Sequence, residues 1–302
     1  MVISGLVSLV FLPLAIIVVG AAALLAGRRR ARSLAFDETI YPGLRSLRRA
    51  TIRYRGIGLA VGGVAGVAAL AWGHLRPLTF AAPLLAAVVV VAAIVVGQQS
   101  AYRAARVTGS AGLERRQLRS YLPPALTRWT VCLLALLLTA VLFSTLAASP
   151  DDMGRAGRAV SVWWIEGEGA QSGTYGAART PFPGSFYTSW VGLALALLLA
   201  LAVLGLVLTV RRPRNGADPE LVRVDDALRR ITVEGIVAAV GVGVSGSALA
   251  VTLVSGMDLL GLGPVPIATA SGAVSLLAAV GALVGLLGSA VVLLVPRDGG
   301  GR

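Results

Sequence analysis

The sequence contains no lysine, one histidine (His74) and one cysteine (Cys132) among its 302 residues. Retinal and pyridoxal Schiff bases and the Walker A phosphate loop all need a lysine side chain, so these chemistries are excluded. One cysteine excludes an internal disulfide and a Cys-x-x-Cys redox pair. One histidine excludes bis-histidine haem and a His/Cys zinc cluster. We therefore expect no cofactor and no metal.

Charge is also scarce. Charged residues make up 14% of the chain and hydrophobic residues 56%, with a mean hydropathy of +0.82, whereas a soluble domain has about 25% charged residues. The apolar residues form runs of the length that crosses a hydrocarbon core, about 20 residues for about 30 Å. We expect an all-α, polytopic helical bundle in a membrane. The seven predicted spans are 3–26, 56–73, 78–97, 130–148, 191–210, 235–255 and 267–295.

Arginine, the sole basic residue, alternates between the segments that connect these spans. Segments 27–55, 98–129, 211–234 and 296–302 hold 23 of the 27 arginines. Positive residues are concentrated in cytoplasmic loops, so this alternation predicts an outer N-terminus and an inner C-terminus. Trp72, Trp129 and Trp190 fall at predicted span ends, where aromatic rings sit at the headgroup level.

We expect one integral membrane domain over 1–302. Spans one to three and their arginine-rich segments occupy 1–129, and a linking span follows over 130–148. An extracytoplasmic loop occupies 149–189, and the last three spans occupy 190–302. The sequence Leu-Arg-Arg-x-Thr occurs at both 47–51 and 228–232. Small residues follow each copy at matching positions, which suggests a parallel 3+1+3 internal repeat. Chance matching in a chain rich in leucine, arginine and glycine is the alternative.

Glycines recur at four-residue spacing within the predicted spans. Lipid tails give helices no hydrophobic drive to associate, so spans pack where small residues let their backbones approach. A substrate path lined by glycine is the alternative to packing. The predicted helix-packing residues are Gly58, Gly62, Gly66, Gly243, Gly281 and Gly285.

The arginine-rich segments also carry apolar residues at helical spacing, over 40–54 and 221–231. This pattern predicts amphipathic helices lying on the inner leaflet, with arginines on anionic lipid headgroups. Docking of a membrane or cytoplasmic protein partner, such as a transporter ATPase, is the alternative. The net charge of +13 does not indicate nucleic acid, because orientation and headgroup contact account for it. The predicted headgroup contacts are Arg28, Arg29, Arg30, Arg48, Arg49, Arg229 and Arg230.

The 149–189 segment is the longest predicted loop, and loops of this length are usually functional or disordered. Its aromatic residues predict an anchor at the membrane surface or, alternatively, a binding surface for an outer-leaflet lipid or envelope partner. Trp163, Trp164 and Tyr187 are the candidates for that surface.

Enzyme motifs are weak. Gly243-Val244-Ser245-Gly246 has the Gly-x-Ser-Gly form of rhomboid-like intramembrane proteases, whose serine needs a histidine base within hydrogen-bond reach. His74 lies at the outer end of span two, whereas Ser245 lies near the middle of span six, so we expect no enzyme. The predicted spans hold no Asp, Glu, Arg or His, which argues against proton- or sodium-driven transport.

In composition alone, the chain resembles multi-pass membrane proteins common in high-GC Gram-positive bacteria. The resemblance rests on arginine as the only basic residue and on spans of Ala, Val, Leu and Gly. This resemblance implies a location in the bacterial plasma membrane, and it implies no activity. We expect a non-enzymatic accessory or permease-like subunit that acts with a partner. A transporter or flippase for an apolar or lipid substrate is the alternative.

Overall fold

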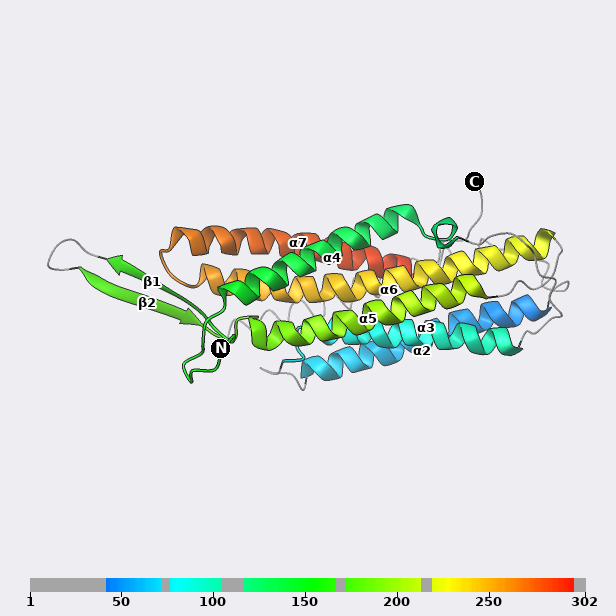
Figure 1. The fold of residues 1–302 in the computed structure, drawn as a ribbon, viewed down its shortest axis with the longest axis horizontal. Helices are drawn as coiled ribbons and strands as arrows, with labels where there is room; N and C mark the ends of the chain where they lie inside the picture. Colours follow the sequence, from blue (N-terminus) through cyan, green and yellow to red (C-terminus); the bar gives the residue numbers. More distant parts are fainter. Residues whose placement is uncertain (1–41, 72–76, 105–116, 167–171, 213–218, 296–302) are drawn as a thin grey trace.

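The structure is a computed structural model that describes residues 42–71, 77–104, 117–166, 172–212 and 219–295. Six long helices and a two-stranded antiparallel sheet make up the described chain (Figure 1). The helices are α2 (Pro42–Ala71), α3 (Ala82–Ala104), α4 (Pro124–Ala147), α5 (Ser185–Arg211), α6 (Pro219–Leu260) and α7 (Pro266–Leu294). The strands are β1 (Val160–Glu166) and β2 (Gly173–Arg179), and a short 3-10 turn, η1 (Leu118–Ser120), precedes α4.

Successive helices run in opposite directions along one long axis (Figure 1). The described arginines of the segments predicted to be cytoplasmic therefore lie toward one end of the bundle. The hairpin of β1 and β2 extends from the opposite end (Figure 1). We call these the arginine end and the hairpin end.

Helix α6 is the centre of the bundle and packs against α7, α4, α3 and α5, while α2 packs mainly on α3. Apolar side chains from α3, α4, α5 and α6 fill the space between these helices. Leu84, Leu137, Leu198, Ile236 and Val244 are each fully buried there.

Five of these helices are long and apolar enough to cross a membrane: Ala82–Ser100, Pro124–Ala147, Ser185–Arg211, Asp225–Leu260 and Pro266–Leu294. Each contains most of a span predicted from the sequence. The predicted span 56–73 overlaps the second half of α2. The predicted first span, 3–26, lies outside the described residues.

The arginine-rich segments do not form separate helices. The predicted 221–231 helix and the 235–255 span are one continuous helix, α6, and the 40–54 segment continues into span two as α2. The prediction of separate amphipathic helices is therefore wrong for both segments. The physical reason in α6 is the absence of proline between Pro219 and Leu260, and the apolar face continues without a break through Leu228, Val233 and Ile236.

The 149–189 segment is not only a loop, because β1 and β2 form an antiparallel hairpin within it. Val160 pairs with Arg179 at the root, and Glu166 pairs with Gly173 near the tip. The strands contain β-branched and aromatic residues, which favour a pleated surface. The expectation of purely α structure is thus corrected by one hairpin.

Candidate functional site

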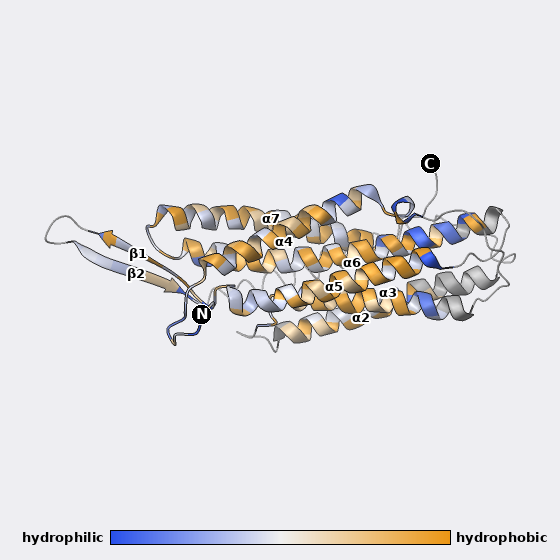
Figure 2. Ribbon diagram, in the orientation of Figure 1, coloured by the Kyte–Doolittle hydropathy of each residue, from blue (hydrophilic) through white to orange (hydrophobic). Residues whose placement is uncertain are grey.

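The outer surface of the bundle is the first candidate site, because many large apolar side chains are exposed there. The helices themselves consist mostly of hydrophobic residues (Figure 2). Large side chains on α4, α5 and α7 point away from the core. In water, an apolar surface of this size would be an association or aggregation site, whereas hydrocarbon would solvate it. The most exposed of these side chains are Leu142, Leu146, Leu193, Val203, Ile267, Val274 and Leu277.

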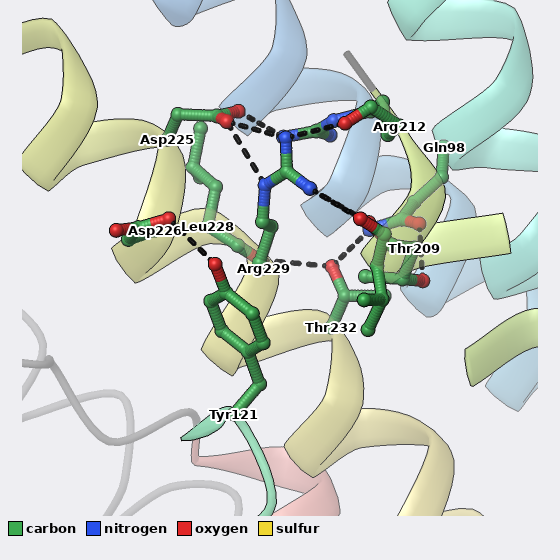
Figure 3. A network of polar contacts seen from close by, with 10 residues as sticks. Gln98, Tyr121, Thr209, Arg212, Asp225, Asp226, Leu228, Arg229 and Thr232 are labelled. Carbon is green, nitrogen blue, oxygen red and sulfur yellow. Dashed lines mark hydrogen bonds and ion pairs between the residues drawn. The ribbon is translucent and has the colours of Figure 1, made fainter. Parts of the chain in front are cut away.

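The second candidate site is a buried ionic cluster at the arginine end (Figure 3). Arg229 of α6 is 0% exposed, and Asp225, one turn earlier, is 1% exposed. The Asp225 carboxylate accepts hydrogen bonds from Arg229 Nε at 2.9 Å and Nη2 at 2.7 Å. The same carboxylate pairs with Arg212, at the end of α5. A buried charge is tolerated only when it is paired and hydrogen-bonded, and this cluster meets both conditions.

The Arg229 guanidinium also closes the end of a second helix. Nη1 donates to the carbonyl oxygens of Thr209 and Val210 at 3.1 Å each, and Nη2 donates to that of Arg212 at 2.8 Å. These carbonyls belong to the C-terminus of α5, where the last four lack partners within their own helix. The helix dipole makes this end negative, so a buried cation is favourable there.

Two further arginines act in the same way on two other helices. Arg55 of α2 donates from Nη2 to the Val292 carbonyl in the last turn of α7, at 2.9 Å. Arg179 at the end of β2 donates from Nε and Nη2 to the Gly261 carbonyl just past α6, at 3.1 and 2.9 Å. Arginines therefore cap the C-termini of α5, α6 and α7, and each arginine comes from a different helix or strand than the helix it caps.

Further hydrogen bonds join α3 and the segment before α4 to the same region (Figure 3). Gln98 of α3 donates from Nε2 to Thr232 of α6. Thr209 of α5 donates to Gln98 Oε1 at 2.9 Å. Tyr121, before α4, donates to Asp226 of α6 at 3.0 Å. Polar contacts thus fix α3, α5, α6 and the start of α4 to one another at the arginine end.

The predicted headgroup arginines have different positions. Arg230 is exposed, as headgroup contact requires, but Arg229 is buried and its donors are taken by Asp225 and by α5. The prediction of headgroup contact is therefore wrong for Arg229. Its i, i+4 spacing from Asp225 is the sequence signal for the buried pair. Arg28, Arg29 and Arg30 lie outside the described residues; Arg48 and Arg49 lie in α2, with side chains outside the described part.

The glycine stripe of α2 lies on the face that meets α3. A Cβ at Gly58 would lie 2.8 Å from the Ala93 Cβ, and one at Gly62 would lie 2.8 Å from the Ala86 carbonyl oxygen. A Cβ at Gly66 would be in ordinary contact with Ala86, at 3.4 Å. Close backbone approach is therefore required at Gly58 and Gly62.

The stripes of α6 and α7 are less uniform. A Cβ at Gly243 would lie 2.6 Å from the Ala87 Cβ of α3, and one at Gly285 would lie 2.4 Å from Leu133 of α4. Gly281 is exposed, and no atom of the described residues lies within 4 Å of its Cβ position, so the packing prediction finds no partner for Gly281 within the described part of the chain. In the suggested repeat, α2 corresponds to α6 and α3 corresponds to α7, so Gly243 should face α7 as Gly62 faces α3. Gly62 and Gly243 both face α3 instead, so the two halves of the suggested repeat do not have equivalent partners.

Sequence reasoning missed several close approaches between helices, of which the two tightest are at Gly97 and Gly241. A Cβ at Gly97 of α3 would lie 2.4 Å from the Tyr54 Cβ, and one at Gly241 of α6 would lie 2.5 Å from Ser289 Oγ of α7. Neither glycine belongs to a recognised stripe. Single close contacts of this kind depend on where two helices cross, which the glycine spacing alone does not specify.

The hairpin end holds the third candidate site. Trp163 is 74% exposed on the hairpin, whereas Trp164 is half-buried and stacks on Tyr175 with ring centroids 6.2 Å apart. Tyr187 is 3% exposed at the start of α5, in edge contact with Phe80 at 5.2 Å. Tyr187 is therefore a core residue, and its prediction as part of an outer binding surface is wrong. Its helical position directs the ring into the bundle.

The root of the hairpin is fixed to the turn between α6 and α7. Phe182 is fully buried in an apolar cluster with Val160, Leu259 and Leu262. Trp164 lies over Gly263, whose φ of +93° suits glycine. Together with the Arg179 cap, these contacts hold an arm that would be only marginally stable as an isolated two-stranded hairpin.

The segment before the hairpin is held by its own charges. Asp151 accepts hydrogen bonds from the backbone N–H of Arg155 at 2.8 Å and from its Nε at 2.9 Å. Partial burial raises the pKa of Asp151, but these hydrogen bonds outweigh it and the net pKa lies below its ordinary value. The carboxylate form therefore orders this turn at neutral pH.

Ser245 is fully buried and donates to the Gly241 carbonyl oxygen at 2.5 Å, within its own helix. His74, the sole candidate base in the sequence, lies outside the described residues. Within the described ranges, no group of three or more His, Cys, Asp or Glu side chains could hold a metal ion.

Comparison with known proteins adds no family. No family model matches the sequence, and neither a curated protein nor a solved structure matches it.

Proposed function

We propose that the chain is an integral protein of the bacterial plasma membrane, with seven spans, an outer N-terminus and an inner C-terminus. It serves as a non-enzymatic accessory or permease-like subunit that acts with a partner. The observation that carries the membrane assignment is the apolar outer surface of five helices long enough to cross a bilayer.

The length of the apolar band supports this placement. Trp129 near the start of α4 and Ala147 at its end are separated by a helical rise of about 27 Å, close to the thickness of a hydrocarbon core of about 30 Å. Trp129 and Trp190 are both partly exposed, at the arginine end and the hairpin end respectively. Half-exposed tryptophan is typical of the two membrane interfaces.

The orientation is supported by the distribution of charge. The exposed arginines Arg53, Arg119, Arg128, Arg211, Arg223 and Arg230 lie on the segments of the arginine end. Those exposed side chains remain able to contact anionic headgroups or a cytoplasmic partner. Because positive residues favour the cytoplasmic side, the hairpin lies outside.

A structural role is favoured over chemistry or substrate passage by the way several interior hydroxyls are bonded, although the buried Ser289 hydroxyl of α7 has no hydrogen-bond partner among the described residues. Thr130, Ser245 and Thr252 each donate to a carbonyl one turn earlier in their own helix. Ser144 and Ser255 bond to each other across α4 and α6, with their Oγ atoms 3.1 Å apart. Polar groups satisfied in this way stabilise a packed bundle and are not available to a substrate.

Native mass spectrometry of the protein, extracted gently from its own membrane, tests the subunit role. A stoichiometric protein companion is the expected result. Retention of a lipid or small molecule, with no protein companion, would contradict it and favour the transporter or flippase alternative.

A further inference from the structure

Two exposed arginines, Arg53 of α2 and Arg211 of α5, lie at the same depth in the bundle, on helices that both pack against α3. Tyr54, next to Arg53, contacts Gly97 of α3, where an added Cβ would lie 2.4 Å from the Tyr54 Cβ. Thr209, two residues before Arg211, donates a hydrogen bond to the side chain of the residue after Gly97, at 2.9 Å. Both arginines are therefore within about one helical turn of the same level of α3.

Each of these arginines continues an exposed apolar stripe of its own helix. The apolar residues lie four and eleven positions after Arg53 in α2, and seven and fourteen positions before Arg211 in α5. These spacings bring side chains to one face of a helix. The faces on which the arginines lie are thus the faces that hydrocarbon would solvate. The exposed apolar side chains of the two stripes are Ile57 and Val64 in α2 and Leu204 and Leu197 in α5.

The depth of the arginines matches the edge of a hydrocarbon core. Trp190, 43% exposed at the hairpin end of α5, is separated from Arg211 by a helical rise of about 32 Å. A hydrocarbon core is about 30 Å thick, so a bilayer with one interface at Trp190 has its other interface at Arg211. Arg53 lies three residues before the predicted span 56–73, at the corresponding end of α2.

The guanidinium groups at this level are available to a ligand. Within the described residues, neither the Arg53 nor the Arg211 side chain forms an ion pair or a hydrogen bond. The Asp225 carboxylate, which is close in the chain to Arg211, is occupied by Arg212 and Arg229. A guanidinium group donates two parallel hydrogen bonds to the oxygens of a phosphate.

We propose that Arg53 and Arg211 bind the phosphate groups of anionic phospholipids in the leaflet at the arginine end. The inference rests on the proposed membrane placement and names the lipid class that this surface selects. Lipid is the occupant because the same helix faces are apolar immediately below the arginines, so the molecule that covers them must combine acyl chains with a negative head group. An anionic lipid does so, whereas a soluble acidic protein would leave the apolar part of the face without a partner.

Arg223 of α6 provides a matched control, because it is exposed but lies farther along the bundle axis. It precedes Thr232 by nine residues, a rise of about 14 Å, and Thr232 is bonded to Gln98 at the level described above. The headgroup layer extends only about 5–8 Å beyond the hydrocarbon core on each side. Arg223 is therefore beyond the reach of the lipid phosphates that Arg53 and Arg211 contact.

Native mass spectrometry of the full chain in detergent tests the proposal. The protein is titrated with phosphatidylglycerol or with phosphatidylethanolamine of the same acyl chains, and the retained lipid adducts are counted. The first lipid is anionic and the second has an ammonium group that competes for its own phosphate. The variants are the Arg53→Gln/Arg211→Gln double variant, the charge-preserving Arg53→Lys/Arg211→Lys double variant, and Arg223→Gln.

The wild-type chain should retain phosphatidylglycerol at least fivefold more than phosphatidylethanolamine. The double glutamine variant should lose at least threefold of that ratio with an unchanged Tm, since both side chains are exposed. The double lysine variant should keep most of the ratio, and Arg223→Gln should keep all of it. No preference in the wild type, an unchanged ratio in the double glutamine variant, or an equal loss in Arg223→Gln would overturn the proposal.

Two further outcomes are distinguished by experiments on native membranes. An acidic protein that copurifies with the wild type and is lost from the double glutamine variant would assign the two arginines to a protein partner and overturn the lipid site. Alkaline carbonate extraction separates failure of the lipid site from failure of the membrane placement. A chain that stays in the membrane fraction but shows no lipid preference refutes the lipid site alone, whereas a chain released by carbonate refutes the placement on which the site rests.

Discussion

Replacing Arg229 with methionine should destabilise the bundle far more than removing any exposed arginine. Methionine is of similar length and fills the same space, but it cannot donate a hydrogen bond. The substitution leaves the Asp225 carboxylate without the two bonds from Arg229 and leaves three carbonyls at the end of α5 without their donors. Removing one partner of a buried ion pair costs about 3–5 kcal/mol when the other charge is left without a partner. Because Arg212 still pairs with Asp225, we expect a cost at the lower end of this range, about 3 kcal/mol.

Thermal unfolding in detergent, followed by tryptophan fluorescence, measures this effect. A loss of that size corresponds to a decrease in Tm on the order of 10 °C. Arg230→Met is the control, because it removes the same charge from the next residue, which is exposed, and should change stability by no more than about 0.5 kcal/mol. Arg229→Lys keeps the charge but loses the planar fork of donors, so its Tm should fall between the two. Equal Tm values for Arg229→Met and Arg230→Met would refute the capping role.

Three further predictions concern packing. Gly62→Leu should lower the Tm in detergent by the equivalent of at least about 1–3 kcal/mol, because a Cβ at this position meets the α3 backbone. Gly63→Leu, at a position with open space, should leave the Tm unchanged. Equal Tm values for the two variants would contradict the α2–α3 contact. Gly285→Leu should disrupt the contact with α4 and reduce the yield of folded protein, while Gly281→Leu should be tolerated. Matching yields of the two variants on size-exclusion chromatography would count against the contact between Gly285 and α4. Phe182→Ala should lower the local stability of the hairpin root by about 3–5 kcal/mol and make the root sensitive to limited proteolysis. Unchanged cleavage would argue against the role of Phe182 in fixing the hairpin to the bundle.

Helix content could be predicted from the sequence because long apolar runs specify a helix in almost any packing. The residue at which each helix begins could not be predicted from the sequence. The span at 235–255 is recognised by its apolarity, but the charged turns before it continue the same helix, since Arg229 and Asp225 neutralise each other inside the bundle. Apolarity locates the membrane-crossing part of a helix and says little about the part beyond it.

Side-chain partners were harder to predict because they depend on where helices cross. Gly281 and Gly285 are one turn apart in the same stripe, yet only Gly285 meets Leu133, because α4 crosses α7 over a short length. Arg229 and Arg230 are adjacent and chemically identical, but their directions on α6 differ, so one is buried and the other exposed. The hairpin did have a signal, since the β-branched and aromatic residues over 160–166 are typical of a strand.

Site-directed labelling tests the central claim, that the bundle crosses the membrane with the hairpin outside and the arginine end inside. In the Cys132→Ser background, Thr174→Cys reports on the hairpin and Arg223→Cys reports on an exposed position of α6 at the arginine end. A membrane-impermeant maleimide should label Thr174→Cys in intact cells and should label Arg223→Cys only after the membrane is permeabilised. Labelling of both positions in intact cells, or of Arg223→Cys alone, would contradict the account.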